Sequence, residues 1–185
     1  MPKRQIRYAV VGLGHIAQVA VLPAFGNARR NSKLAALVSG DELKRTSLAE
    51  KYGVEKAYSY EQYDECLKTV DAVYIALPNH LHCEYAVRAA KAGVHVLVEK
   101  PMAVTEEECE EMIRAAREAR VKLMVAYRLH FGRANLEAGE IARSGRIREP
   151  RQFNSTSCTP VVPGNTRVRR DTGGGVLYDI GIYCI

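Results

Sequence analysis

Near-continuous apolar segments, each followed by a turn and a helical pattern, constrain this chain more than any other feature. They lie at residues 6–11, 34–38, 57–58, 71–77, 95–98 and 123–126. Parallel strands covered on both faces read in this way, whereas strands with one solvated face alternate between apolar and polar residues. Alternating strand and helix patterns with short connections predict an α/β fold, a doubly wound parallel sheet of the Rossmann type.

Helical patterns lie between these expected strands and continue beyond them. They cover residues 15–26, 43–52, 60–67, 81–92, 105–120 and 131–144. Gly53, Gly93 and Gly145 follow three of these segments, at positions that favour a left-handed cap. The pattern changes after Tyr127, where the polar, β-branched residues 152–159 predict a strand with one solvated face.

Net charge and cysteine content argue against several classes of protein. The chain has 27 Lys and Arg and 21 Asp and Glu, a mild net charge of +6, and it carries no nucleic-acid-binding motif. Five cysteines without a C-x-x-C pair argue against a disulfide framework or a metal site and favour a reducing compartment. No apolar run is long enough to span a membrane and no leader peptide is recognisable, so we expect a cytoplasmic protein.

The segment Gly12-Leu13-Gly14-His15-Ile16-Ala17 fits the pattern G-x-G-x-x-A between the first strand and the first helix. In that pattern the first glycine makes a tight turn and the second lets the backbone approach a pyrophosphate. Unpaired N–H groups at the start of the helix then face the phosphates. We therefore expect a dinucleotide site at Gly12, Gly14, His15 and Ile16. The alternative is a glycine turn that serves packing alone.

The end of the second strand bears on which dinucleotide binds. NAD-binding folds usually carry an acid there, which bonds the ribose 2′-hydroxyl. Here Ser39 takes that place, with Lys44 and Arg45 following, so a 2′-phosphate would meet a hydroxyl and cations. We predict NADP, bound in part by Ser39 and Lys44. Asp41 leaves NAD possible if it folds back toward the ribose, and a solvated helix face is the alternative for the two cations.

Five motifs, in order, make the chain resemble the Gfo/Idh/MocA oxidoreductases, and within them the glucose–fructose oxidoreductase branch. The motifs are GLGHIA at residues 12–17, LPNHLH at 77–82, EKP at 99–101, AYR at 126–128, and GGG at 173–175 with DIGIY at 179–183. The resemblance covers essentially the whole chain. It implies further cofactor-binding residues, namely Leu77, Pro78, Asn79, His82, Glu99, Lys100 and Arg128.

The resemblance also implies catalytic residues. Lys100 would lie at the nicotinamide and the substrate hydroxyl, where an ammonium lowers the pKa of an alcohol and stabilises the developing oxyanion. Pro101 would follow a cis peptide bond, as is typical of the family. Tyr183 stands where the family commonly has histidine; it would accept the proton, and Asp179 would bond a sugar hydroxyl. These two residues are four apart, so on a helix they would share one face.

Each catalytic candidate also has an alternative, purely structural explanation. Glu99 and Lys100 would otherwise form a surface ion pair, Tyr183 would be a half-buried packing residue, and Asp179 a charge in the first turn of a helix.

The predicted function is an NADP-dependent oxidoreductase that transfers hydride between the nicotinamide and a sugar or polyol carbon. A non-catalytic, dinucleotide-sensing regulator of the same fold is the alternative; the presence of Lys100, Asp179 and Tyr183 favours the enzyme. By the resemblance, residues 1–128 form an NADP-binding Rossmann domain. Residues 129–185 would then be the incomplete start of an α+β substrate and dimerisation domain with an open, mostly antiparallel sheet. We expect the native protein to be longer, and to be a homo-oligomer if that domain is complete.

Overall fold

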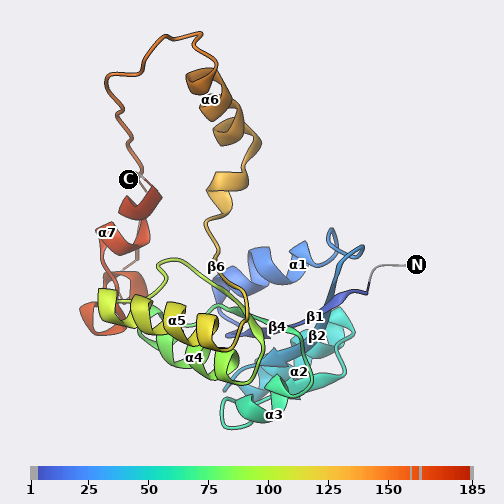
Figure 1. The fold of residues 1–185 in the computed structure, drawn as a ribbon. Helices are drawn as coiled ribbons and strands as arrows, with labels where there is room; N and C mark the ends of the chain where they lie inside the picture. Colours follow the sequence, from blue (N-terminus) through green and yellow to red (C-terminus); the bar gives the residue numbers. More distant parts are fainter. Residues whose placement is uncertain (1–3, 159, 163, 184–185) are drawn as a thin grey trace. The chain divides into compact units, whose positions relative to one another are not determined.

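The computed structural model describes residues 4–158, 160–162 and 164–183, and it divides into two compact units, Met1–Val125 and Ala126–Ile185 (Figure 1). The strands of the first unit are β1 (Ile6–Val11), β2 (Ser32–Val38), β3 (Lys56–Tyr58), β4 (Ala72–Ile75), β5 (His95–Val98) and β6 (Leu123–Val125). They form one sheet in the order β3-β2-β1-β4-β5-β6, and every pair is parallel. The predicted doubly wound Rossmann sheet is confirmed.

Helices connect these strands as the sequence predicts. They are η1 (Ala17–Val21), α1 (Leu22–Ala24), α2 (Glu42–Tyr52), α3 (Tyr63–Leu67), η2 (Asn79–Leu81), α4 (His82–Lys91) and α5 (Glu106–Glu118). The first helix, residues 15–24, contains the π-helical segment η1. Helix α3 begins at Tyr63, whereas the sequence predicts a start at residue 60. Residues 59–62 form a turn instead, in which the side chain of Gln62 accepts a hydrogen bond from the Ser59 N–H (3.0 Å).

Apolar side chains of alternating strand residues build a core on each face of the sheet. Ala9 and Val11 of β1 belong to the larger core, which includes residues of α3, α4 and α5. Val10 belongs to the other core, with residues of η1, α1 and α2. All three strand residues are fully buried, which explains why β1 reads as a continuous apolar run. The strands thus hold their connecting loops at fixed places along one edge of the sheet.

The second unit contains helices and irregular segments. Its helices are η3 (Arg128–Phe131), α6 (Arg133–Arg143), η4 (Thr166–Val168), η5 (Arg170–Thr172), α7 (Val176–Asp179) and η6 (Gly181–Tyr183). The predicted strand is wrong for residues 152–158, which are irregular; Thr159 lies outside the described residues. A strand needs a partner for its N–H and C=O groups, and the described residues of this unit include no second strand. The expected antiparallel sheet is therefore not seen in the described part of this unit.

Among the residues that the structure describes, no helix combines the length and the apolar character that crossing a bilayer requires.

Candidate functional site

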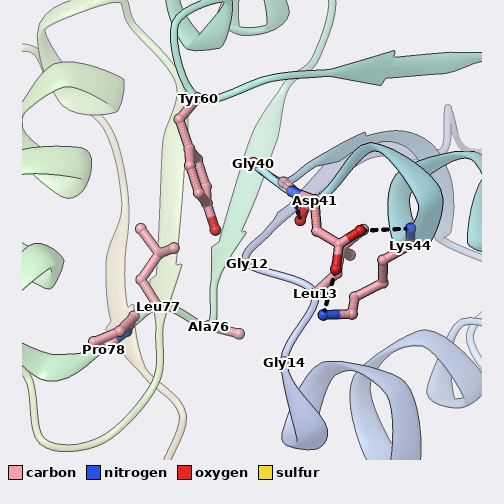
Figure 2. Close-up of a pocket in the computed structure, with 11 residues that line it drawn as sticks. Gly12, Leu13, Gly14, Gly40, Asp41, Lys44, Tyr60, Ala76, Leu77 and Pro78 are labelled. Atoms are coloured by element: carbon pink, nitrogen blue, oxygen red, sulfur yellow. Dashed lines mark hydrogen bonds and ion pairs between the residues drawn. The ribbon is translucent and has the colours of Figure 1, made fainter.

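A cleft of about 280 Å³ opens at the carboxyl ends of β1, β2 and β4 (Figure 2). The chain reverses its winding between β1 and β4, and ligands of open α/β sheets bind at such a switch point. The cleft brings together predicted cofactor residues from three separate loops. It is lined by Gly12, Leu13, Gly14, Ser39, Gly40, Asp41, Lys44, Tyr60, Ala76, Leu77 and Pro78.

The two glycines of the first turn differ in the space that surrounds them. Gly12 has φ +91°, and a Cβ there would lie 2.5 Å from the Ala76 carbonyl oxygen, so only glycine fits between β1 and β4. A Cβ at Gly14 would meet no atom within 4 Å. Gly14 therefore leaves the backbone accessible to a phosphate at the start of the helical residues His15 and Ile16.

The loop after β2 supplies polar groups to one end of the cleft. Ser39 is buried, and its Oγ accepts the Asp41 N–H (3.2 Å). Asp41 caps α2, since its Oδ1 accepts the Lys44 N–H (2.9 Å), while its Oδ2 lies 3.1 Å from Lys44 Nζ. Arg45 turns to the Ser39 carbonyl oxygen, to which it donates at 2.8 Å. Ser39 and Lys44 thus line the cleft, and Arg45 does not; that the first two bind the cofactor stays a prediction.

Tyr60 is a cleft residue that the sequence analysis missed. Its hydroxyl points into the cleft (Figure 2), and its ring lies against Gly40, where a Cβ would be 3.2 Å from two ring carbons. Burial raises the pKa of Tyr60, opposed by hydrogen bonds to the Gly40 backbone and the Ser39 side chain, so the hydroxyl stays protonated at neutral pH. The sequence signal was its place just after β3, because parallel strands end at the same edge of a sheet.

His82 is fully buried and joins the two loops that follow β4 and β5. Its Nδ1 lies 2.8 Å from the Pro101 carbonyl oxygen, and its Nε2 lies 2.9 Å from the Leu77 carbonyl oxygen. Burial lowers the pKa of His82, which favours the neutral ring. A ring with no exposed surface does not itself reach a ligand in the cleft. Its effect on the site is exerted through the backbones of Leu77 and Pro101.

The EKP segment lies in the loop after β5. Glu99 accepts a hydrogen bond from the Tyr74 hydroxyl at Oε1 (2.8 Å) and one from the Lys100 N–H at Oε2 (3.3 Å). Lys100 is half-buried, and its peptide bond to Pro101 is cis, as predicted. Leu77 and Pro78, in the loop after β4, line the cleft, and Asn79 follows them as the first residue of η2.

The remaining site candidates lie in the second unit. Asp179 is 15% exposed, and its Oδ2 lies 3.4 Å from Arg167 Nε. The ring of Tyr183 meets that of Tyr127 edge-on, 6.3 Å between centroids. Asp179 and Tyr183 are not on one helix: α7 ends at Asp179, and Gly181, a poor helix former, begins η6. Arg128 is exposed at the start of η3.

The expected catalytic set is therefore divided between the units. Lys100 belongs to the first, and Asp179 and Tyr183 belong to the second. That these three residues act together remains a prediction. Among the described residues, no group of three His, Cys, Asp or Glu side chains is placed to hold a metal ion.

Comparison with known proteins identifies the family. The family model of the Gfo/Idh/MocA oxidoreductases, an oxidoreductase family with an NAD-binding Rossmann fold, matches residues 6–127. The chain belongs to the Gfo/Idh/MocA family.

Several relatives of this chain have names that describe reactions on sugars. A D-xylose 1-dehydrogenase [NADP(+)] from Haloarcula marismortui is 34% identical, over 96% of this chain and 52% of the relative. The structure of an aldose–aldose oxidoreductase from Caulobacter crescentus, complexed with glycerol, matches at a TM-score of 0.86 and 39% identity, covering 97% of this chain and 55% of that one. A 3-ketoreductase from Actinomadura kijaniata, in complex with TDP-benzene and NADP, matches at a TM-score of 0.83 and 32% identity, over 97% and 54%.

The chain spans about half the length of the curated relatives it matches. As a member of the Gfo/Idh/MocA family it carries the family's NAD-binding Rossmann fold at residues 6–127.

Proposed function

We propose that this protein is an NADP-dependent oxidoreductase that transfers hydride between the nicotinamide and a sugar or polyol carbon. An aldose is the favoured substrate class, because relatives named for aldose chemistry match nearly the whole chain. The observation that carries the proposal is the cleft itself. The Gly12–Gly14 turn lines it together with Ser39 and Lys44.

The choice of NADP rests on the polar groups that line the cleft. A hydroxyl at the tip of β2 replaces the acid that bonds the ribose 2′-hydroxyl of NAD. Lys44 adds a cation, and the protonated Tyr60 adds a second hydroxyl. These groups suit a 2′-phosphate, which accepts strong charge-assisted hydrogen bonds. Relatives whose names or bound ligands include NADP agree with this reading.

Lys100 is the proposed catalytic residue of the first unit. A nicotinamide dinucleotide supplies or takes up the hydride, and the protein must manage the proton on the substrate oxygen. An ammonium beside a substrate hydroxyl lowers the pKa of that hydroxyl and stabilises the oxyanion that develops as the hydride leaves. Glu99, held by the Tyr74 hydroxyl, and His82, held between two carbonyl groups, would fix the loop that carries Lys100.

Asp179 and Tyr183 are the proposed substrate-side residues. Tyr183 would accept the hydroxyl proton, because a nearby cation lowers the pKa of a phenol. Asp179 would accept a hydrogen bond from a second sugar hydroxyl, a role in which its partner Arg167 would orient the carboxylate.

Arg128 remains a cofactor candidate. A homo-oligomer and a cytoplasmic location stay predictions from the sequence.

The proposal is tested first by binding and then by turnover. Purified chain of verified mass is titrated with NADPH and with NADH, and then assayed with NADP and a panel of aldoses. We expect tighter binding of NADPH, and turnover that Lys100→Met abolishes although the variant still binds NADPH. We expect little turnover from 185 residues alone, so the assay includes the longest natural form of the protein. Failure of the chain to bind either dinucleotide would contradict the proposal, and binding without turnover in any form would favour a regulator.

A further inference from the structure

Asp41 carries a negative charge in the part of the cleft, beside Ser39 and Lys44, where we propose that the 2′-phosphate binds. Its carboxylate is held at Oδ1 by the Lys44 N–H (2.9 Å), as the cap of α2, and at Oδ2 by Lys44 Nζ (3.1 Å) (Figure 2). The backbone N–H of Asp41 is itself bonded to Ser39 Oγ (3.2 Å). Backbone and side chain both tie Asp41 to the two residues that would bind the phosphate.

The charge of Asp41 persists at neutral pH. Its hydrogen bonds to the backbone and side chain of Lys44 lower the pKa of the carboxyl group. Both partners are partly exposed, 41% for Lys44 and 49% for Asp41, so the ion pair itself adds little stability. A ligand phosphate can therefore separate the pair at small cost. The carboxylate nevertheless stays beside the phosphate, because the cap of α2 holds it there.

We propose that Asp41 sets the discrimination between NADP and NAD in this cleft, by holding the ammonium of Lys44 and placing a negative charge where the 2′-phosphate binds. This inference rests on the proposed function. It goes beyond that function because it predicts that Asp41 makes the preference of the wild type for NADP over NAD weaker than it would be without this carboxylate. Ser39, Lys44 and Tyr60 attract the 2′-phosphate and Asp41 repels it, whereas NAD, with a 2′-hydroxyl, is little affected.

Asp41→Asn isolates the charge. Asparagine caps a helix as well as aspartate does and has nearly the same size, so α2 keeps its N-terminus while the carboxylate and the ion pair are removed. We expect the Kd for NADPH to fall about fivefold, and the Kd for NADH to change by less than about twofold. Both are measured by nucleotide fluorescence at one fixed, moderate salt concentration, with circular dichroism to verify folding.

Two further variants make the test specific. Glu42→Gln removes the same charge from the adjacent residue, which caps nothing and does not line the cleft, and should leave the ratio of the two Kd values unchanged. In the background of Lys44→Gln the Asp41 carboxylate still lies beside the 2′-phosphate, so Asp41→Asn should still lower the Kd for NADPH and leave the Kd for NADH little changed.

The results separate this inference from the proposed function. Wild-type binding of both nucleotides with no change in their Kd ratio in Asp41→Asn would overturn the inference and leave the function standing. An equal shift in Glu42→Gln would also overturn it, because the effect would then be one of net charge. If the folded wild type binds neither nucleotide, the proposed function fails and the inference fails with it.

Discussion

The buried imidazole of His82 lies 2.8 Å from the carbonyl oxygen of Pro101, and its other nitrogen lies 2.9 Å from the carbonyl oxygen of Leu77. A carbonyl oxygen only accepts, so a neutral imidazole satisfies one of them with its single N–H and leaves its lone pair facing the other. The ring therefore donates to one of two loops, the loop that lines the cleft or the loop that carries Lys100, and packs against the other. Burial, which lowers the pKa of the ring, outweighs the contacts that raise it, namely those with the backbones of Pro101, Leu77 and Met102 and with the Glu99 charge.

Replacement of His82 by leucine should therefore destabilise the first unit. The variant keeps the bulk of the side chain but removes the donor from a site with no exposed surface, and we expect a loss of about 2 kcal/mol in the free energy of unfolding at pH 8. Urea denaturation measures it. His80→Gln, two residues earlier and exposed, is the matched control and should change stability by less than about 0.5 kcal/mol.

The pH dependence of stability gives His82 a second test. Its folded pKa is lowered, so the unfolded chain binds the proton more readily. The contribution of His82 is present above the ordinary histidine pKa of about 6.5 and is lost as the pH falls below it. Wild-type stability should thus decline between about pH 7.5 and 5.5 more steeply than that of His82→Leu. Parallel pH profiles for the two proteins would rule out this account of the buried ring.

Gly12 and Gly14 should respond differently to the same substitution. Gly12→Ala forces a Cβ to within 2.5 Å of the Ala76 carbonyl oxygen at a positive φ, and should cost more than about 2 kcal/mol of unfolding free energy. Gly14→Ala adds a methyl group where no atom lies within 4 Å, so stability should be unchanged while NADPH binding weakens about tenfold. Thermal unfolding and nucleotide titration of both variants provide the check. Equal loss of stability in both would show that the second glycine serves packing.

The sequence predicts the sheet well because burial on both faces leaves a strong and simple pattern. Val10 and Val11 point to opposite cores, and both must be apolar. The segment at residues 152–158 was mistaken for a strand because β-branched composition reports a local preference, whereas strand formation depends on a partner. The break between Asp179 and Tyr183 was likewise missed, since residue spacing alone does not show where a helix ends.

The cleft was predicted where a motif marks it and missed where only topology does. The G-x-G-x-x-A pattern predicts Gly12 and Gly14, the end of the second strand predicts Ser39 and Lys44, and all four line the cleft. Tyr60 was assigned to a helix, and only the strand order places the end of β3 beside that of β2. Asp41 was noted as a complication for NADP, but the sequence does not show that it caps α2 and holds Lys44.

Asp71 should stabilise the opposite end of the sheet in a pH-dependent way. It accepts hydrogen bonds from the Arg7 backbone (2.9 Å) and guanidinium and pairs with Arg4 (2.9 Å), and these contacts hold its pKa well below the usual range. A lowered folded pKa gives stability above the unfolded value, about 3.9, that is lost as the pH falls. Asp71→Asn should therefore cost about 1 kcal/mol at pH 7 and clearly less at about pH 2.

Urea denaturation at the two pH values measures the effect of Asp71→Asn. Asp64→Asn is the comparison, because Asp64 also pairs with an arginine, Arg88, but is 69% exposed. It should change stability little at either pH. A loss in Asp71→Asn that is equally large at about pH 2 would contradict the assigned role of the carboxylate charge.

Tyr60→Phe tests whether the missed cleft residue serves the cofactor. The ring remains packed against Gly40, so the variant should fold, with a loss of no more than about 1.5 kcal/mol for the hydrogen bonds of its hydroxyl, while the hydroxyl that points into the cleft is removed. If that hydroxyl donates to the 2′-phosphate, the Kd for NADPH should rise about three- to tenfold, as expected for a hydrogen bond to a charged group. The Kd for NADH should change by less than about twofold. Tyr52→Phe, outside the cleft, controls for loss of a hydroxyl. An equal rise for both nucleotides would place the hydroxyl near a part of the cofactor that they share.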